Sequence, residues 1–189
     1  GMSFLMTVRG CPFHCWFCAA RENYTGLRFF PIDHVIAEMK DIANNFHPLT
    51  IRIFDDVFNL KKDRVRELTS RMIAEGLTKD ISYMCWVRAE LLDQEYVDLL
   101  KAANFVHVSF GIESAADDLM KKMKGGRINQ EAVQRAIDLL HDAGIKVGCT
   151  FIVGIPGETA KELDETYAFI EKNADKMLDV ELNPLTPLP

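Results

Sequence analysis

The chain has 189 residues, of which 48% are hydrophobic and 26% are charged, and its formal net charge is −6. These values fit one globular domain that is long enough to bury a substantial core. Lysine and arginine are scattered along the sequence, which argues against a nucleic-acid-binding stripe. No apolar run reaches the length of about 18 residues that a membrane helix needs. Five cysteines without a secretory signal favour the reducing cytoplasm.

Strand-like and helix-like segments alternate along the chain. Nearly continuous apolar runs predict six strands, at residues 3–8, 50–58, 81–87, 105–112, 146–155 and 177–185. Helical periodicity predicts a helix after each strand except the last, at residues 31–46, 62–77, 93–103, 129–144 and 159–170. Asp93, Asn129 and Thr159 are the expected N-caps, and residues 121–130 are expected to form a polar insert. This alternation predicts parallel βαβ units, in either a doubly wound sheet or a curved, barrel-like sheet.

In both arrangements, functional side chains belong at the carboxyl ends of the strands. Each predicted strand is followed by a group of residues suited to that role. These groups are a three-cysteine loop, Asp55 with Asp56, Arg88, Glu113, the GIPGE turn at residues 154–158, and Asn183.

The cysteine loop reads RGCPFHCWFCAA over residues 9–20 and holds Cys11, Cys15 and Cys18. Three thiolates on one short loop can hold three corners of a cubic iron–sulfur cluster, and soft thiolates suit such clusters and zinc alike. Zinc would need a fourth ligand, and the one obvious local candidate, His14, occupies a cramped position beside Cys15. The spacing therefore favours a cluster. The other two cysteines, at positions 85 and 149, lie in apolar strands and are expected in the core.

This loop resembles the signature of the radical S-adenosylmethionine (SAM) enzymes, in which an aromatic residue, here Phe17, precedes the third cysteine. The later strands match the family in order, so the resemblance covers essentially all of residues 1–189. It implies a partial (β/α)6, TIM-like barrel with a curved parallel sheet. It also implies that Cys11, Cys15 and Cys18 bind three irons of a 4Fe–4S cluster whose fourth iron is chelated by SAM. Electrons from a donor such as ferredoxin or flavodoxin would then cleave SAM to a 5′-deoxyadenosyl radical.

The resemblance also implies which strand ends contact SAM. Asp55 is implied to contact the amino group, which leaves Asp56 to bind substrate or cap the next helix. Arg88 is implied to pair with the methionine carboxylate, which a forked guanidinium suits, although a surface salt bridge with Glu90 or with a helix residue explains it equally well. Glu113 is implied to accept hydrogen bonds from the ribose hydroxyls. A glutamate after a buried run needs a ligand or a cation as its partner.

Residues 148–159, GCTFIVGIPGET, resemble the adenine-binding strand and turn of the family. Ile152 is implied to pack on adenine, and Gly154 and Gly157 are implied to allow close backbone approach. Asn183, at the end of the last strand, is implied to lie near the ribose or adenine, with a plain turn as the alternative.

Residues 18–39 resemble the cobalamin-binding radical SAM group, which includes methyltransferases and anaerobic cyclases. Gly26 and Arg28 fit its pattern, whereas Phe29 replaces an expected second arginine. Methylthiotransferases are the runner-up, although their arginine-rich run after the cysteines is absent, and a non-catalytic iron–sulfur module is a further alternative. The sequence begins ten residues before Cys11, so we expect an excised catalytic core without its cobalamin-binding and C-terminal domains. Cobalamin stays open as a cofactor of the full-length protein, and the sequence does not identify the small-molecule substrate.

Overall fold

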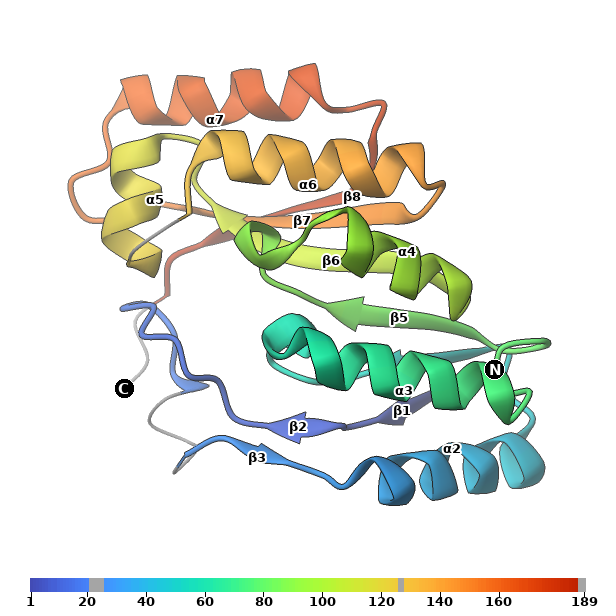
Figure 1. The fold of residues 1–189 in the computed structure, drawn as a ribbon. Coiled ribbons are helices and arrows are strands. Elements are labelled where there is room, and N and C mark those ends of the chain that lie inside the picture. The colour runs from blue at the N-terminus through green and yellow to red at the C-terminus, as the bar shows by residue number, and fades with distance from the viewer. Residues whose placement is uncertain (21–25, 126–127, 187–189) are drawn as a thin grey trace.

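A computed structural model describes residues 1–20, 26–125 and 128–186. It is built around a six-stranded sheet in the order β1-β4-β5-β6-β7-β8, in which every neighbouring pair is parallel (Figure 1). The strands are β1 (Met2–Leu5), β4 (Thr50–Ile53), β5 (Ser82–Trp86), β6 (Phe105–Glu113), β7 (Lys146–Val153) and β8 (Met177–Pro184). All six predicted strands are present, so the prediction of parallel βαβ units is confirmed.

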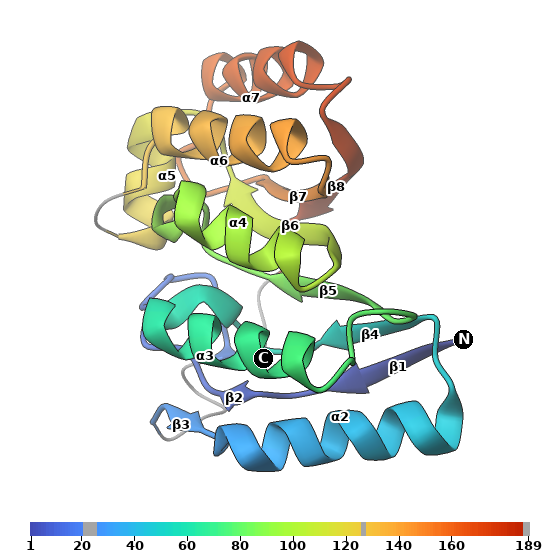
Figure 2. The same cartoon turned by 45° about the vertical axis from the view of Figure 1, so that its right-hand side comes forward.

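Five helices follow the first five strands and lie on one face of the sheet (Figures 1 and 2). They are α2 (Ile32–Phe46), α3 (Lys62–Ala74), α4 (Gln94–Ala102), α6 (Gln130–Asp142) and α7 (Ala160–Lys172). The main hydrophobic core lies between these helices and the sheet and includes Cys85 and Cys149, as predicted. In the part of the chain that the structure describes, no helix is long and apolar enough to cross a membrane.

The predicted helix N-caps are confirmed. The Asp93 carboxylate accepts a hydrogen bond from the Tyr96 backbone N–H at 3.0 Å, and the Asn129 side chain accepts one from the Ala132 N–H at 2.8 Å. Thr159 opens α7 with the expected capping box. These caps satisfy N–H groups that have no partner inside the helix, so they fix where each helix begins relative to the strand before it.

Two features near the strand ends differ from the sequence prediction. Part of the expected polar insert forms α5 (Asp117–Lys124), while residues 126–127 of that insert lie outside the described residues. Acidic residues begin this helix and lysines end it, which complements the helix dipole, and its apolar stripe is buried. A short antiparallel ribbon of β2 (Val8–Arg9) and β3 (Arg28–Phe29) flanks the cysteine loop. Residues 21–25, within the segment that resembles the cobalamin-binding group, also lie outside the described residues.

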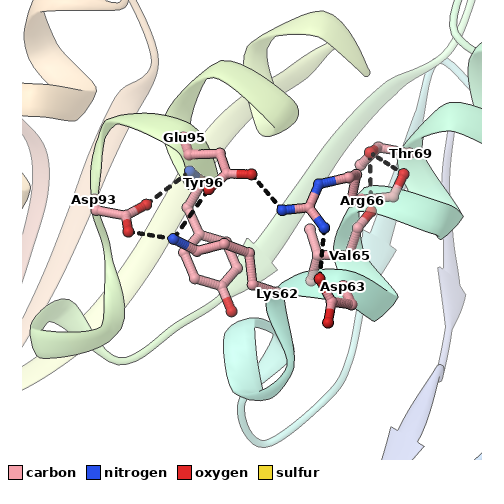
Figure 3. Close-up of polar contacts among 8 residues, drawn as sticks. All are labelled: Lys62, Asp63, Val65, Arg66, Thr69, Asp93, Glu95 and Tyr96. Atoms are coloured by element: carbon pink, nitrogen blue, oxygen red, sulfur yellow. Dashed lines mark hydrogen bonds and ion pairs between the residues drawn. The ribbon is translucent and has the colours of Figure 1, made fainter.

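An ion-pair network joins the first turns of α3 and α4 on the surface (Figure 3). Lys62 pairs with Asp93 and, at 3.3 Å, with Glu95. Arg66 also pairs with Glu95, and with Asp63 at 2.5 Å. Exposed pairs of this kind contribute little free energy, about 0 to 1 kcal/mol each, so the network aligns two helices rather than holding the fold together.

Candidate active site

A cavity of about 180 Å³ lies at the carboxyl ends of the central strands. Its lining includes six of the predicted site residues, namely Cys11, Cys15, Phe17, Cys18, Arg88 and Glu113. Four others are absent from the lining that the structure describes, namely Asp55, Ile152, Gly154 and Asn183. A larger hollow of about 600 Å³ lies before β4 and β5, between the ends of α2 and α3. Because ligands of parallel sheets bind at the carboxyl ends of strands, the smaller cavity is the candidate site.

The cysteine loop is anchored on α5. The Trp16 backbone N–H donates to the Met123 carbonyl at 3.0 Å, and the Cys18 N–H closes a turn onto the Cys15 carbonyl at 3.1 Å. All three thiols are free. Burial raises the pKa of the Cys11 thiol, the nearby Cys15 acts in the same direction, and a backbone hydrogen bond from Phe13 opposes them.

The donor set fits an iron–sulfur cluster better than a zinc ion. Three thiols from one loop line the same cavity, whereas His14 is exposed and lies outside the lining that the structure describes. Over residues 1–20, 26–125 and 128–186, no three His, Cys, Asp or Glu side chains stand close enough to hold a single metal ion.

Asp55 is buried beneath the site rather than directed into the cavity. Its carboxylate accepts hydrogen bonds from the Thr7 N–H at 2.6 Å, the Thr7 hydroxyl at 2.5 Å and the Val8 N–H at 3.0 Å. Burial raises its pKa to about 6 in spite of these bonds. Asp56, by contrast, is exposed and lines the cavity. Asp55 therefore holds the start of the β2 segment against β4, and the geometry favours Asp56 for any contact with a bound cation.

Arg88 follows β5 and is 5% exposed. Its Nε donates to Glu90 Oε1 at 2.5 Å, and its Nη1 lies 3.5 Å from Cys15 Sγ. The predicted ion pair with Glu90 is present, but it is buried rather than on the surface. Burial disfavours the charged guanidinium, yet Glu90 and Cys15 outweigh this effect and raise the pKa of Arg88.

Glu113 ends β6 and is 7% exposed. Its Oε1 lies 3.5 Å from Lys124 Nζ, which also donates to the Gly111 carbonyl. The Glu113 side chain folds back over Gly111, since a Cβ on that glycine would lie 3.0 Å from Glu113 Cδ and closer still to Oε1. Burial raises the pKa of Glu113, and Lys124 opposes this shift. The cation that the sequence argument required for Glu113 is thus Lys124, although a ligand can still compete for the carboxylate.

The turn after β7 lies beside the cavity. Ile152 and Phe17 each pack against a small apolar cluster formed by α5, its N-cap Ala116 and Ile155. Gly154 has a φ of +79°, and its N–H donates to the Glu158 carboxylate at 2.7 Å. Asn183 is exposed and pairs with Ile152 in the β7–β8 ladder. The backbone after β7 therefore forms the tight turn that the glycines predict.

Two site residues escaped the sequence prediction. Lys124 lies in a segment that the sequence predicted to be a polar insert. The sequence did not predict α5, and it is this helix that places Lys124 against β6. Asn59 is 1% exposed and brackets the Arg88 backbone, since its Nδ2 donates to the Arg88 carbonyl at 3.0 Å and its Oδ1 accepts from the Arg88 N–H at 2.9 Å. The available signal for this role was an asparagine directly after the predicted strand 50–58.

A parallel βα sheet with three thiols lining a cavity at its carboxyl edge defines an α/β protein whose candidate site is suited to an iron–sulfur cluster. A family model described as the Radical SAM superfamily matches residues 5–170. The chain belongs to the radical SAM superfamily, and the predicted partial (β/α)6 barrel is confirmed.

Relatives and solved structures agree with this assignment. An uncharacterized methyltransferase of Pyrococcus horikoshii is 31% identical over 170 residues, which cover 89% of this chain and 36% of that protein. Anaerobic magnesium-protoporphyrin IX monomethyl ester cyclase of Cereibacter sphaeroides is 30% identical over 165 residues, or 85% of this chain and 26% of that protein. The structure of the radical SAM methyltransferase TsrM from Kitasatospora setae, with cobalamin and a 4Fe–4S cluster bound, superimposes with a TM-score of 0.86. It is 23% identical, and the match covers 97% of this chain and 34% of that one.

These matches confirm the predicted resemblance to the radical SAM superfamily, and the cobalamin-bound TsrM structure has the same fold. The chain spans about a third or less of the length of these relatives.

Proposed function

We propose that this chain is the catalytic core of a radical SAM enzyme, with Cys11, Cys15 and Cys18 as the ligands of a 4Fe–4S cluster. The observation that carries the proposal is the convergence of these three free thiols on one cavity at the carboxyl edge of the sheet. A reduced cluster of this kind, when bound, supplies the electron that cleaves SAM into methionine and a 5′-deoxyadenosyl radical. Ferredoxin or flavodoxin is the proposed source of that electron.

The remaining residues of the cavity provide contacts for the polar groups of SAM. The exposed Asp56 carboxylate suits the cationic amino group, in place of the Asp55 that the sequence suggested. Glu113 offers an acceptor for the two ribose hydroxyls, held ready by Lys124. Outside the cavity lining, Ile152 and the Gly154 turn are the proposed contacts for the flat base, and Asn183 lies beside Ile152 in the adjacent strand.

For the full-length protein we propose methyl transfer or oxidative cyclisation of a small molecule, with cobalamin as a cofactor. Support comes from the methyltransferase and cyclase relatives and from the cobalamin-bound structure of the same fold. The pattern of Gly26 and Arg28 before α2 points the same way. Corrinoid absorption in the purified full-length protein is the measurement that checks this part.

The core activity is tested by anaerobic reconstitution with iron and sulfide. We expect about four irons per chain with broad visible absorption, and formation of 5′-deoxyadenosine and methionine when dithionite and SAM are added. Stoichiometric zinc without iron uptake would refute the proposal. A stable cluster that binds no SAM would instead favour an electron-transfer module.

A further inference from the structure

One cation of the cavity contacts a cysteine directly. Arg88 Nη1 lies 3.5 Å from Cys15 Sγ, within hydrogen-bonding range for a sulfur acceptor. The other cation of the cavity, Lys124, is directed instead to the Gly111 carbonyl and the Glu113 carboxylate. Arg88 and Lys124 therefore bring the same charge to one cavity but act on different atoms.

Three contacts hold the Arg88 guanidinium in this position, and two more hold its backbone. Nε donates a hydrogen bond to Glu90 Oε1, and Nη2 forms an ion pair with the same oxygen. The guanidinium carbon lies 3.9 Å from the centroid of the Phe13 ring, in the same loop as the cysteines. Asn59 fixes the Arg88 backbone from both sides. The guanidinium is thus held by Glu90 and Phe13, and its Nη1 can donate to the Cys15 thiol.

The Arg88–Glu90 pair is a poor candidate for a device that only stabilises the fold. Both side chains are almost fully buried, at 6% and 9% exposed, and within the described residues Glu90 Oε2 has no hydrogen-bond partner. Buried ion pairs often contribute no net stability because desolvation offsets their attraction, and an unsatisfied buried oxygen adds to that cost. The contact of the guanidinium with Cys15 explains the buried Arg88–Glu90 pair better than a contribution to stability does.

We propose that Arg88 is a positioning residue that donates an N–H···S hydrogen bond to the cluster ligand Cys15 and thereby raises the reduction potential of the cluster. This inference rests on the proposed function, since it takes Cys15 as a ligand. One-electron reduction adds a negative charge to the cluster, and a hydrogen bond to a coordinating sulfur stabilises that charge. Glu90 holds the fork in place and partly offsets its charge. This role differs from the SAM-carboxylate contact that the sequence suggested for Arg88.

The test is an anaerobic redox titration of the reconstituted chain, followed by electron paramagnetic resonance of the reduced cluster. Arg88→Gln should shift the midpoint potential to lower values, and Arg88→Lys should shift it less because the charge remains without the fork. Lys124→Gln is the matched control, because it removes a charge from the same cavity without removing a sulfur hydrogen bond. Glu90→Gln should shift the potential upward, since the amide oxygen still accepts from Arg88 while the negative charge is gone.

The outcomes separate this inference from the proposed function. A downward shift in Arg88→Gln that is no larger than the shift in Lys124→Gln would overturn the inference, even if the wild-type chain binds iron and cleaves SAM. Wild-type chain that takes up no iron would overturn both. If Arg88→Gln assembles no cluster, Arg88→Lys decides, because it keeps the charge and removes the fork, and an unchanged potential in that variant counts against the hydrogen bond.

Discussion

Glu113 has a backbone φ of 70°, which places a non-glycine residue in the left-handed region at the end of β6. Such a conformation costs about 1 to 3 kcal/mol and tends to occur at functional sites. The turn folds the carboxylate back over Gly111 and beside Lys124, at the mouth of the cavity. The strained backbone of Glu113 therefore places its carboxylate at the cavity, whereas a regular strand would direct that side chain away from it.

Replacing Glu113 by Gln should weaken SAM binding while leaving the iron content unchanged. Hydrogen bonds to a charged group contribute about 1.5 to 3 kcal/mol, so we expect SAM affinity to fall roughly ten- to a hundredfold. Equilibrium binding of SAM to the reconstituted protein, alongside iron analysis, makes the measurement. Loss of iron in this variant would mean that Glu113 supports the fold.

Gly111→Ala tests the fold-back itself. Its Cβ would meet the Glu113 carboxylate, so the carboxylate must move away from Lys124. We expect SAM affinity to fall by about tenfold or more, corresponding to about 1.4 kcal/mol, with iron content retained. Gly76→Ala is the control for loss of stability alone: its φ of +71° strains an alanine there, but its Cβ meets no atom within 4 Å and the residue lies at the opposite edge of the sheet from the cavity, so SAM affinity should not change. Unchanged SAM affinity in Gly111→Ala would show that the carboxylate does not bind the ligand.

At the scale of elements, the sequence predicts what is local and misses what depends on packing. Buried parallel strands read as apolar runs, and the caps of α4, α6 and α7 are visible in a few residues. The cysteine spacing is equally local. The role of Asp55 was not predictable. The alternation of side chains along a strand places one of two adjacent carboxylates on the inner face, but it does not predict that Thr7 will donate its hydrogen bonds to that carboxylate. Lys124 was missed because α5 is short and lies in a polar stretch.

Asp55 links β4 to the β2 segment, and its titration predicts how stability depends on pH. Its folded pKa of about 6 exceeds the ordinary value of 3.8. Between about pH 4 and 6 the folded state keeps a proton that the unfolded state has released, so stability falls as pH rises through this window. The loss is about 3 kcal/mol at about 1.4 kcal/mol per pKa unit.

Urea unfolding from pH 4 to 7.5 checks this prediction. Asp55→Asn should flatten the slope, because an amide has no proton to lose. Asp56→Asn is the matched control, because the Asp56 carboxylate is adjacent in sequence but exposed and lines the cavity. This variant should keep the slope of the wild type. Equal slopes in all three proteins would contradict the assignment to Asp55.

At the scale of the whole molecule, a single open sheet brings together side chains from most of the chain. β1 and β8 are its two edges, and the cysteines follow the first strand while the Gly154 turn follows the fifth. Periodicity could not decide between a doubly wound sheet and a barrel, since both consist of the same βα units. The family resemblance made that choice, and the superposition on known structures confirmed it.

SAM should stabilise the molecule only after the cluster is in place. With SAM at about 100 times its dissociation constant, we expect about 2.7 kcal/mol of stabilisation, or roughly 5 to 10 °C in Tm for a domain of this size. Differential scanning fluorimetry of the reconstituted protein measures this shift. Cys15→Ser should abolish it, whereas His14→Ala should keep it. Loss of the shift in His14→Ala would revive His14 as a metal ligand.

The bond between Trp16 and Met123 has a consequence for how the protein matures. The three thiols leave the ribosome well before the helix that anchors their loop, which is encoded more than half of the 189 residues later. Contacts between residues so distant in sequence form slowly, because a long loop must close before they are made. We therefore expect the loop to stay loose until α5 has docked. Metal delivery is then a late event in biogenesis, and oxygen has its longest access to the cysteines before that step.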